Sequence, residues 1–491
     1  MKKNKKDQKI NQKSFYFEDY NYSSKNESKK NKLNINEDRI YLLFFIFFSL
    51  IFIFSIKIFI TSLQNPFYKL HSQNHSFFKS LRGDITDRNG ETIARNIRVY
   101  HAAIKPSLIK DKKKFILKLK INYPELDTEA FKKNLYKNKY FYFKKNITEE
   151  ERAKLWSFGE NGILFEKTQT RIYPQKNLFS HVIGQIDLDN NGISGIEKYF
   201  DRDLKSSKQK NIKLSLDANL QYLVRDELLK SIVNFNAKGA GGILMDVKNG
   251  EVLSLVSLPD YDLNIRQEIK HDKFTNKVTK GVFELGSIFK TFTIALALEK
   301  NLFSPDAMIE NIPHEIKCSR YTITEHDKLP GNLSVRDILI RSSNIGTIKV
   351  ARKIGQKKLK EFLEDLNLLN VSNIELNETG TPLYFNWGNK CKLETVSYGH
   401  GITTTPLQAA TAYASIANGG FIVEPTLIKD KNSSLDRKKI ISNETSKKIN
   451  AILREVVTNN HGTATLANIE GYYVGGKTGT AKKNINGEYT S

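Results

Sequence analysis

The segment Gly286–Glu299 has the spacing of a serine nucleophile and its base. An apolar run of helix-compatible residues follows the glycine, with Ser287 in the first turn and Lys290 one turn later. Residues three apart share one face of a helix, so the Lys290 amine can reach the Ser287 hydroxyl. Apolar surroundings disfavour the charged form of a lysine, which can then accept a proton. The pattern predicts that Ser287 is an activated nucleophile.

The spacing alone is weak evidence, because a helix start with a nearby lysine is the simpler interpretation. The same Ser-x-x-Lys pattern occurs at Ser76–Lys79, Ser107–Lys110 and Ser207–Lys210. Two later motifs, Ser342-Ser343-Asn344 and Lys477-Thr478-Gly479, strengthen the case. Taken singly, the first could be a polar turn and the second an exposed edge strand. In this order, the three are typical of serine acyltransferases that act on penicillin-like substrates.

Composition predicts a multidomain globular protein. The chain has 491 residues, 39% of them apolar, which is enough for two or three domains. Its net charge of +24 could indicate nucleic acid or a membrane surface. The lysines are spread along the chain beside many Asn and Ile residues, so A/T-rich codon usage explains the charge at least as well as a polyanionic partner does, and no nucleic-acid partner is expected. Cys318 and Cys391 have no metal-type spacing; two isolated buried thiols are favoured over one bridge, which stays possible in an oxidising compartment.

The N-terminal part is predicted to anchor the chain in a membrane. Residues 1–39 are polar and lysine-rich and read as a disordered cytoplasmic tail. Residues 40–63 are almost wholly apolar and long enough to cross a bilayer. A cleaved signal peptide is disfavoured, because no small-residue cleavage site follows. Everything after about Leu63 is expected outside the cytoplasmic membrane.

Local patterns predict most of the later elements. Asn89-Gly90 and Asn249-Gly250 are tight-turn signals between strands, and Thr405-Pro406-Leu407-Gln408 resembles a capping box. Asp217 is a plausible N-cap for a helix that ends at Leu229. The other expected elements are strands at Ile212–Leu216, Gly241–Val247, Glu251–Leu258 and Tyr472–Lys482, and helices at Val335–Ile340, Ile345–Leu369 and Thr445–Thr458.

These motifs together resemble those of the class B penicillin-binding proteins. Arg82–Ala94 is similar to the RGxIxDRNGxxLA motif of that class, Asn276–Glu299 to the segment around its nucleophile, and Tyr398–Gln408 to its YGxGxxxTPLQ stretch. Val282–Gly286 and Arg171–Pro174 look closer to the division-specific enzyme than to the elongation enzyme.

The resemblance implies a fold of three parts. A single N-terminal transmembrane helix precedes a mixed α/β, non-catalytic pedestal (dimerisation-type) domain at 64–210. An α/β penicillin-binding transpeptidase domain follows at 211–491, with an antiparallel sheet flanked by helices and an all-helical subdomain. In the family, two strands and a helix follow the Lys-Thr-Gly strand, so we expect a C-terminally truncated chain that is inactive or poorly folded.

The resemblance also implies a peptidoglycan D,D-transpeptidase. Ser287 would attack the penultimate D-Ala carbonyl of a stem peptide, with Lys290 as its base. Ser342 would relay the proton towards the leaving amine. Asn344 would hold the substrate amide and the side of the site on which Lys290 lies. Lys477 would supply positive charge, and the segment Thr478-Gly479-Thr480 would bind the substrate carboxylate. Backbone N–H groups of Ser287 and Thr480 would form the oxyanion hole. No metal or organic cofactor is implied, and the lysine mechanism leaves His400 no task as a base.

The implied partners are D-Ala-D-Ala stem peptides, β-lactams, a septal lipid II polymerase of the SEDS family and other divisome proteins. The implied location is the cytoplasmic (inner) membrane, with one span, the N-terminus in the cytoplasm and the bulk in the periplasm. Alternatives left open are an elongation-type transpeptidase, a β-lactamase or D,D-carboxypeptidase, and a non-catalytic penicillin-binding scaffold or sensor.

Overall fold

The N-terminal apolar run forms one long helix. The residues that the computed structural model describes are 37–63, 82–206, 210–265, 272–319, 321–384, 387–388, 390–431, 437–481, 483–485 and 488–490. Helix α1 (Glu37–Leu63) contains the stretch Ile40–Ile60, whose 21 residues have a mean hydropathy of 2.7. At about 1.5 Å per residue, this stretch matches the thickness of a bilayer's hydrocarbon core. Most of the predicted tail lies outside the described residues.

A five-stranded sheet begins the second of two units, Met1–Lys79 and Ser80–Ser491. Its order is β3-β2-β1-β5, and β4 also pairs with β2. The predicted turn at Asn89-Gly90 is confirmed, because Gly90 has φ +94° and joins antiparallel β1 and β2. The strand after this turn, β2, is longer than the short strand that we expected. The strands are β1 (Ile85–Thr86), β2 (Thr92–Ile104), β3 (Phe141–Ile147), β4 (Ile163–Ile172) and β5 (Ile212–Lys213).

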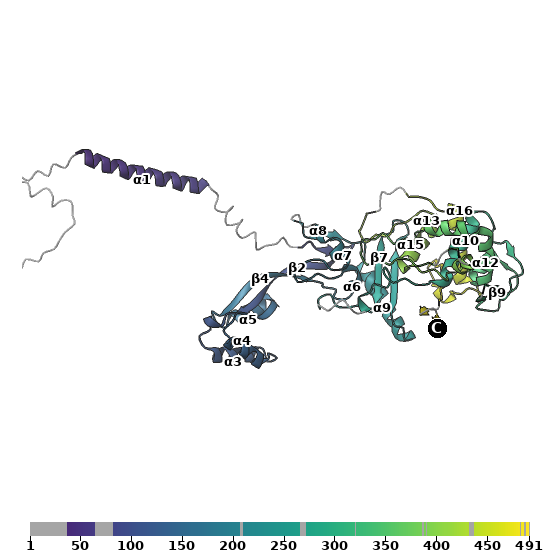
Figure 1. Cartoon of the computed structure of the whole chain (residues 1–491), viewed down its shortest axis with the longest axis horizontal. Coiled ribbons are helices and arrows are strands. Elements are labelled where there is room, and N and C mark those ends of the chain that lie inside the picture. The colour runs from purple at the N-terminus through teal and green to yellow at the C-terminus, as the bar shows by residue number, and fades with distance from the viewer. Residues whose placement is uncertain are drawn as a thin grey trace, which may run out of the picture. The chain divides into compact units, whose positions relative to one another are not determined.

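Short helices cover the far part of this sheet and enclose a separate core. Figure 1 shows β2 and β4 running side by side towards α3, α4 and α5. Phe115, Phe131 and Leu155 from these helices pack into one apolar cluster with Ile104 and Ile147 of the sheet. The elements are η2 (Pro106–Leu108), α3 (Lys112–Asn122), α4 (Thr128–Tyr136), α5 (Glu149–Trp156), α6 (Ser180–Ile183), α7 (Gly195–Tyr199) and α8 (Asp201–Leu204).

A buried network of charges holds the base of the sheet. Glu197 is fully buried and pairs with Arg82 and, at 2.7 Å, with Arg171. Arg82 also contacts Asp201 at 2.6 Å. Arg82 comes from the segment before β1, Arg171 from β4 and the carboxylates from α7 and α8. The network therefore ties together segments that are far apart in sequence.

The part of the chain that follows β5 begins with a helix packed on a hairpin. Asp217 caps α9 (Ala218–Phe235), as predicted, although the helix runs past Leu229. The hairpin is confirmed as β6 (Ala240–Met245) paired with β7 (Val252–Leu258), and Gly250 has φ +78°. Their apolar cluster also contains side chains of β1, β2 and α6, so the two parts share a core.

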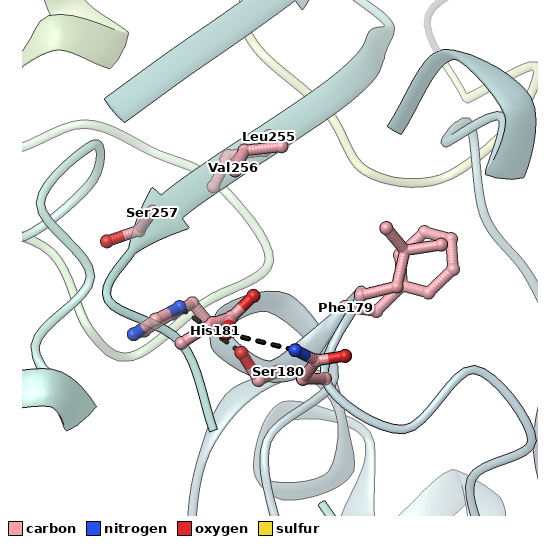
Figure 2. A pocket seen from close by; sticks show the side chains of 9 residues that line it. Phe179, Ser180, His181, Leu255, Val256 and Ser257 are labelled. Carbon is pink, nitrogen blue, oxygen red and sulfur yellow. Dashed lines mark hydrogen bonds between the residues drawn. The ribbon is translucent and has the colours of Figure 1, made fainter. Parts of the chain in front are cut away.

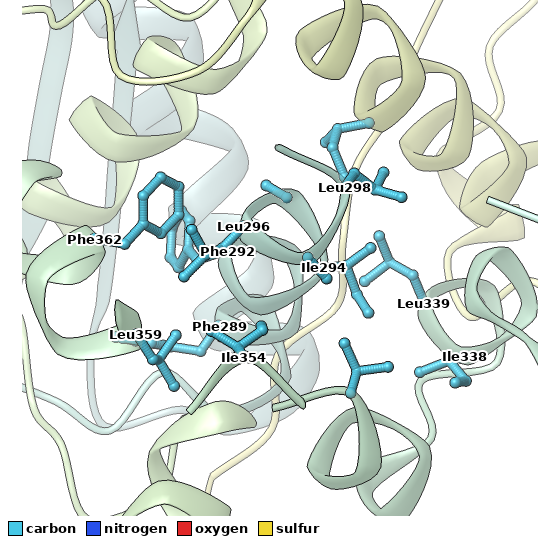
Figure 3. Close-up of a cluster of buried hydrophobic side chains, with 14 of the residues drawn as sticks. Phe289, Phe292, Ile294, Leu296, Leu298, Ile338, Leu339, Ile354, Leu359 and Phe362 are labelled. Carbon is cyan, nitrogen blue, oxygen red and sulfur yellow. The ribbon is translucent and has the colours of Figure 1, made fainter. Parts of the chain in front are cut away.

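Helix α10 (Phe289–Glu299) lies at the centre of the larger apolar core. Every residue from Phe289 to Leu298 is buried, so the helix has no solvent face. Figure 3 shows Phe292, Ile294 and Leu298 meeting side chains from the surrounding helices. Those helices are α11 (Val335–Ile340), α12 (Asn344–Ile354), α13 (Gln356–Asp365), α14 (Lys392–Ser397), α15 (Pro406–Ala417) and α16 (Asn443–Thr458). The remaining elements are η3 (Asp272–Phe274), η4 (Gly286–Ile288), η5 (Thr465–Ala467), β8 (Met308–Ile309), β9 (Glu315–Cys318), β10 (Tyr321–Thr324), β11 (Leu333–Ser334), β12 (Lys483–Ile485) and β13 (Glu488–Thr490).

Several predicted elements are confirmed and three are wrong in detail. The capping box at Thr405 is present, and α11 and α16 lie where patterning placed them. The helical run Ile345–Leu369 is broken at Gly355, which has φ +88°. The strand at Ile212 ends at Lys213. Residues 472–481 form no strand. Their backbone bonds to α16 instead: Gly476 N donates to the Leu453 carbonyl, and the Arg454 side chain donates to the Val474 carbonyl.

Replacing Glu197 by glutamine should lower the free energy of unfolding by about 3 kcal/mol, because two buried guanidinium groups lose a compensating charge. Chemical denaturation followed by fluorescence measures the change. The control is Glu129→Gln, which breaks an exposed pair with Lys132 and should cost less than about 0.5 kcal/mol. Equal, small effects from both would show that the network does not stabilise the fold.

Candidate active site

The turn η4 (Gly286–Ile288), called the nucleophile turn after the role predicted for Ser287, lies between two other backbone segments at very close range. Ser287 is half-buried in the 3₁₀ turn η4, directly before α10. A β-carbon added to Gly286 would lie 2.3 Å from the Thr480 carbonyl oxygen, and one added to Gly399 would lie 2.1 Å from the Gly286 carbonyl oxygen. Only glycine fits such approaches, and both residues also have positive φ. The glycines therefore let three distant segments converge beside Ser287.

The Lys290 amine is buried and points at Ser342. Lys290 is fully buried in the first turn of α10, and its Nζ donates to the carbonyl and, at 3.1 Å, to Oγ of Ser342. Desolvation, assisted by the positive charge of Lys477, lowers the Lys290 pKa to about 7, although the nearby Glu325 carboxylate opposes the shift. A neutral amine is therefore available near neutral pH.

Ser342 and Asn344 lie on a sharp turn between α11 and α12. Ser342 has φ +61°, which is uncommon for a residue with a side chain. Ser343 caps α12 by accepting from Gly346 N at 2.9 Å. The Asn344 side chain donates to the Thr324 carbonyl at 3.0 Å, so its amide group faces the β9–β10 hairpin.

The buried carboxylate of Glu325 holds this turn from the other side. Its oxygens accept from the Ser343 hydroxyl at 2.6 Å and from the backbone N–H groups of Asn344 and Ile345 at 2.7 and 2.9 Å. A negative charge at a helix N-terminus also interacts favourably with the helix dipole. Sequence reasoning missed Glu325, because nothing in its local pattern distinguishes it from other acidic residues.

The segment Lys477–Thr480 closes the site without being a strand. Burial lowers the pKa of half-buried Lys477 to about 8, and its Nζ donates to the carbonyl of Thr478 at 3.1 Å. Thr478 donates its hydroxyl to Thr463 at 2.9 Å. A β-carbon on Gly479 would lie 2.5 Å from the Leu285 carbonyl oxygen, so the segment packs on the nucleophile turn. Thr478, Gly479 and Thr480 are exposed.

The segment around His400 contacts the approach to the nucleophile. Glu284 accepts from Gly401 N at 3.0 Å and lies 3.8 Å from His400 Nδ1. Burial lowers the His400 pKa, and the negative charge of Glu284 opposes this. The positive charge of Lys290 also lowers the His400 pKa, and the imidazole lies beside Glu284.

The two cysteines form a disulfide, so the preference for isolated thiols was wrong. Cys318 at the end of β9 bonds to Cys391 at the start of α14, with the Cα atoms 5.7 Å apart. The pairing is tertiary: the fold brings together residues 73 positions apart in the chain. Local sequence carries no signal of this approach.

A small cavity elsewhere does not compete with this site. Figure 2 shows Ser180 and His181 facing Leu255, Val256 and Ser257 of β7 across a cavity of about 10 Å³. That volume holds roughly one water molecule and no substrate. His181 Nε2 donates to the Lys273 carbonyl at 2.8 Å, and burial lowers its pKa. In the described part of the chain, no group of three or more His, Cys, Asp or Glu residues could hold a metal ion.

Comparison with known proteins agrees with this geometry. Residues 240–491 match the family described as penicillin binding protein transpeptidase domain, and residues 78–221 match the penicillin-binding protein dimerisation domain. The chain therefore belongs to the penicillin-binding protein transpeptidase family. With both domains and an apolar N-terminal helix, it is a class B penicillin-binding protein.

Its relatives make it FtsI-like within that class. The peptidoglycan D,D-transpeptidase FtsI of Buchnera aphidicola is 31% identical over 452 residues, covering 83% of this chain and 77% of the relative. A protein named probable peptidoglycan D,D-transpeptidase FtsI from Caulobacter vibrioides is 29% identical over 407 residues, covering 82% and 69%. The stage V sporulation protein D of Bacillus subtilis is 27% identical over 457 residues, covering 84% and 70%.

Replacing Glu325 by glutamine should destabilise the protein by about 2 kcal/mol, because the Ser343–Ile345 donors lose a charged acceptor. Urea denaturation of the whole chain measures this. Glu315→Gln, an exposed change on the same hairpin, is the matched control and should cost less than about 0.5 kcal/mol. If the two variants unfold at the same urea concentration, Glu325 does not hold the turn.

Proposed function

We propose that this chain is a serine D,D-transpeptidase that cross-links peptidoglycan stem peptides through an acyl-enzyme on Ser287. The observation that carries the proposal is the fully buried Lys290 amine, held against Ser342 one helical turn beyond Ser287. Burying a charged ammonium group is costly. The burial of Lys290 is therefore best explained by a need for its neutral amine as a base.

Acylation uses Lys290 as the base. The neutral amine takes the proton of the Ser287 hydroxyl while Oγ attacks the penultimate D-Ala carbonyl carbon. The developing oxyanion accepts from the backbone N–H groups of Ser287 and Thr480, whose segments are packed together through Gly286. When the peptide bond breaks, the proton passes from Lys290 through Ser342 to the departing D-Ala amine. An amine of a second stem peptide then attacks the ester, forming the cross-link and restoring the Ser287 hydroxyl.

The remaining site residues bind the donor peptide. Lys477, in its protonated form, supplies positive charge towards the substrate carboxylate, and Thr478 and Thr480 donate hydroxyl groups to it, with Gly479 keeping their backbone close to the nucleophile turn. Asn344 orients the substrate amide. β-Lactams present a similar carbonyl and carboxylate, so they acylate Ser287 in the same way and block it.

The proposed domain assignment is a cytoplasmic tail at 1–39, an anchor at 40–63, a pedestal at 64–210 and the transpeptidase domain at 211–491. The protein would be a single-pass inner-membrane protein with its bulk in the periplasm. The Cys318–Cys391 disulfide supports this orientation, because such bonds form and persist outside the reducing cytoplasm.

A role in septal synthesis is favoured over one in elongation. Two of the relatives described above are named FtsI, and the chain is similar to them from pedestal to transpeptidase domain. We propose a septal lipid II polymerase of the SEDS family and other divisome proteins as partners. An elongation-type role is the second candidate.

A fluorescent penicillin should label the full chain in detergent or nanodiscs at Ser287, and such labelling would refute the expectation from the sequence that the chain is inactive or poorly folded. Ser287→Ala should abolish labelling, and Lys290→Ala should slow it by about 10³-fold, because general-base catalysis is lost. Lys110→Ala is the matched control, since Ser107–Lys110 has the same spacing, and it should label normally. Mass spectrometry identifies the labelled residue. Undiminished labelling of Lys290→Ala would refute the proposed base.

Labelling is followed by a chase with unlabelled compound. A transpeptidase releases the penicilloyl group slowly, whereas a β-lactamase releases it quickly. Failure of the folded wild-type chain to label would favour a non-catalytic scaffold.

The second-order rate of acylation should depend on pH in a bell shape. Lys290 must be neutral, so the rate should rise with pH through about 7. Lys477 must be protonated, so the rate should fall as pH rises through about 8. Stopped-flow labelling from pH 5.5 to 10 measures both limbs, and Lys477→Arg should remove the alkaline one. A rate that still climbs up to pH 10 would contradict these assignments.

A further inference from the structure

The β9–β10 hairpin that supports the active-site turn has little packing of its own. It is a separate two-stranded sheet, with Cys318 opposite Tyr321 and Glu315 opposite Thr324. Its apolar face joins a small cluster in which Ile323 packs against Ile348 and Tyr398. Two-stranded hairpins are marginally stable by themselves. Ile316 of β9 also packs against the larger apolar core. The hairpin is therefore held by a few apolar contacts, by hydrogen bonds to the start of α12 and by the disulfide.

This hairpin sets the position of residues around the Lys290 amine. The Thr324 carbonyl accepts from the Asn344 side chain, and Glu325 accepts from Ser343, Asn344 and Ile345. Ser342, which precedes these residues, is the partner of Lys290. Movement of the hairpin would therefore move the turn that faces the base.

The other end of the disulfide belongs to the segment of α14, which packs on α12 and, through Tyr398, on Ile323 of the hairpin. Cys391 is the N-cap residue of α14 and has φ +72°, a conformation that a residue with a side chain adopts only where its surroundings hold it. Helix α14 leads to Gly399, which packs against Gly286 of the nucleophile turn. The bond thus joins the hairpin that contacts Asn344 to the segment that packs on Gly286, the residue before Ser287.

We propose that oxidation of Cys318 and Cys391 is the maturation step that completes this active site, so that acylation depends on the redox state of the pair. The inference rests on the transpeptidase function proposed above. Without the bond, the hairpin keeps its packing of Ile323 against Tyr398 but can shift relative to α14. Ser342 and Asn344 then lose their fixed position, and Lys290 faces a mobile partner.

The redox step is an ordinary thiol–disulfide exchange. The two cysteine thiols give up two protons and two electrons to a disulfide of a thioredoxin-type oxidant outside the cytoplasm, which becomes a dithiol as the Cys318–Cys391 bond forms. A dithiol reductant reverses the reaction. Both cysteines are half-buried rather than sealed, so exchange partners can reach them.

The test measures acylation of the full chain in nanodiscs before reduction, after reduction with dithiothreitol, and after reoxidation. Alkylation and mass spectrometry first count the free thiols in each state. Reduction should slow fluorescent-penicillin acylation by at least about tenfold, since small misplacements of catalytic groups cost that much, and reoxidation should restore it. The Cys318→Ala/Cys391→Ala variant should be acylated at the rate of the reduced enzyme, and dithiothreitol should not change that rate.

A second readout separates positioning from simple loss of stability. The Glu325 charge raises the Lys290 pKa, so releasing the hairpin should move the acid limb of the pH–rate profile to lower pH. Rates are measured at a temperature at which circular dichroism shows both redox states folded. A slower rate with the acid limb unmoved would overturn the positioning role.

The outcomes also distinguish this inference from the proposed function. Equal acylation of the oxidised and reduced enzyme, or two free thiols in enzyme isolated from cell membranes, would overturn the inference alone. No acylation of Ser287 in the oxidised enzyme would overturn the proposed function and the inference together.

Discussion

The site depends on keeping the Lys290 amine out of water. An ammonium group in a low-dielectric interior is unfavourable, so burial in α10 shifts the amine towards its neutral form. The surrounding helices make this possible, because α10 is buried on every side and its other polar side chains have partners. Thr293, for example, donates to the Ser397 carbonyl at 2.8 Å. One helix thus supplies the centre of the core and the residue, Lys290, that we propose as the base for Ser287.

Electrostatic balance around this amine comes from two residues on separate segments. Lys477 pushes its pKa down and Glu325 pushes it up. Glu325 is itself fixed at the N-terminus of α12. There it accepts hydrogen bonds from the Ser343 hydroxyl and from N–H groups that have no acceptor within the helix. The same carboxylate therefore shapes the turn and tempers the base. Close backbone packing at Gly286, Gly399 and Gly479 lets these segments meet.

Sequence patterns predicted what is local. The Asn249-Gly250 hairpin, the Asp217 cap and the Thr405 capping box each follow from residues within a few positions of one another. The spacing of Ser287 and Lys290 also encodes their common helical segment, and the three motifs in order pointed to one site. The features that sequence patterns did not predict depend on tertiary contacts. Cys318 pairs with Cys391, and Glu325 supports the turn before α12, through contacts between residues far apart in the sequence. The neighbouring residues in the chain give no signal of these contacts. Residues 472–481 were expected as a strand, but a strand exists only where a neighbouring strand completes its ladder of hydrogen bonds.

The protonation state of Lys290 tests the central claim most directly. The full chain, labelled with ¹³C at the lysine ε-carbon, can be titrated by NMR in nanodiscs, with Lys290→Arg identifying the resonance. We expect the Lys290 signal to titrate with a midpoint near pH 7. A midpoint near the ordinary lysine value of 10.5 would mean that the amine is charged under working conditions, and the mechanism built on it would be wrong.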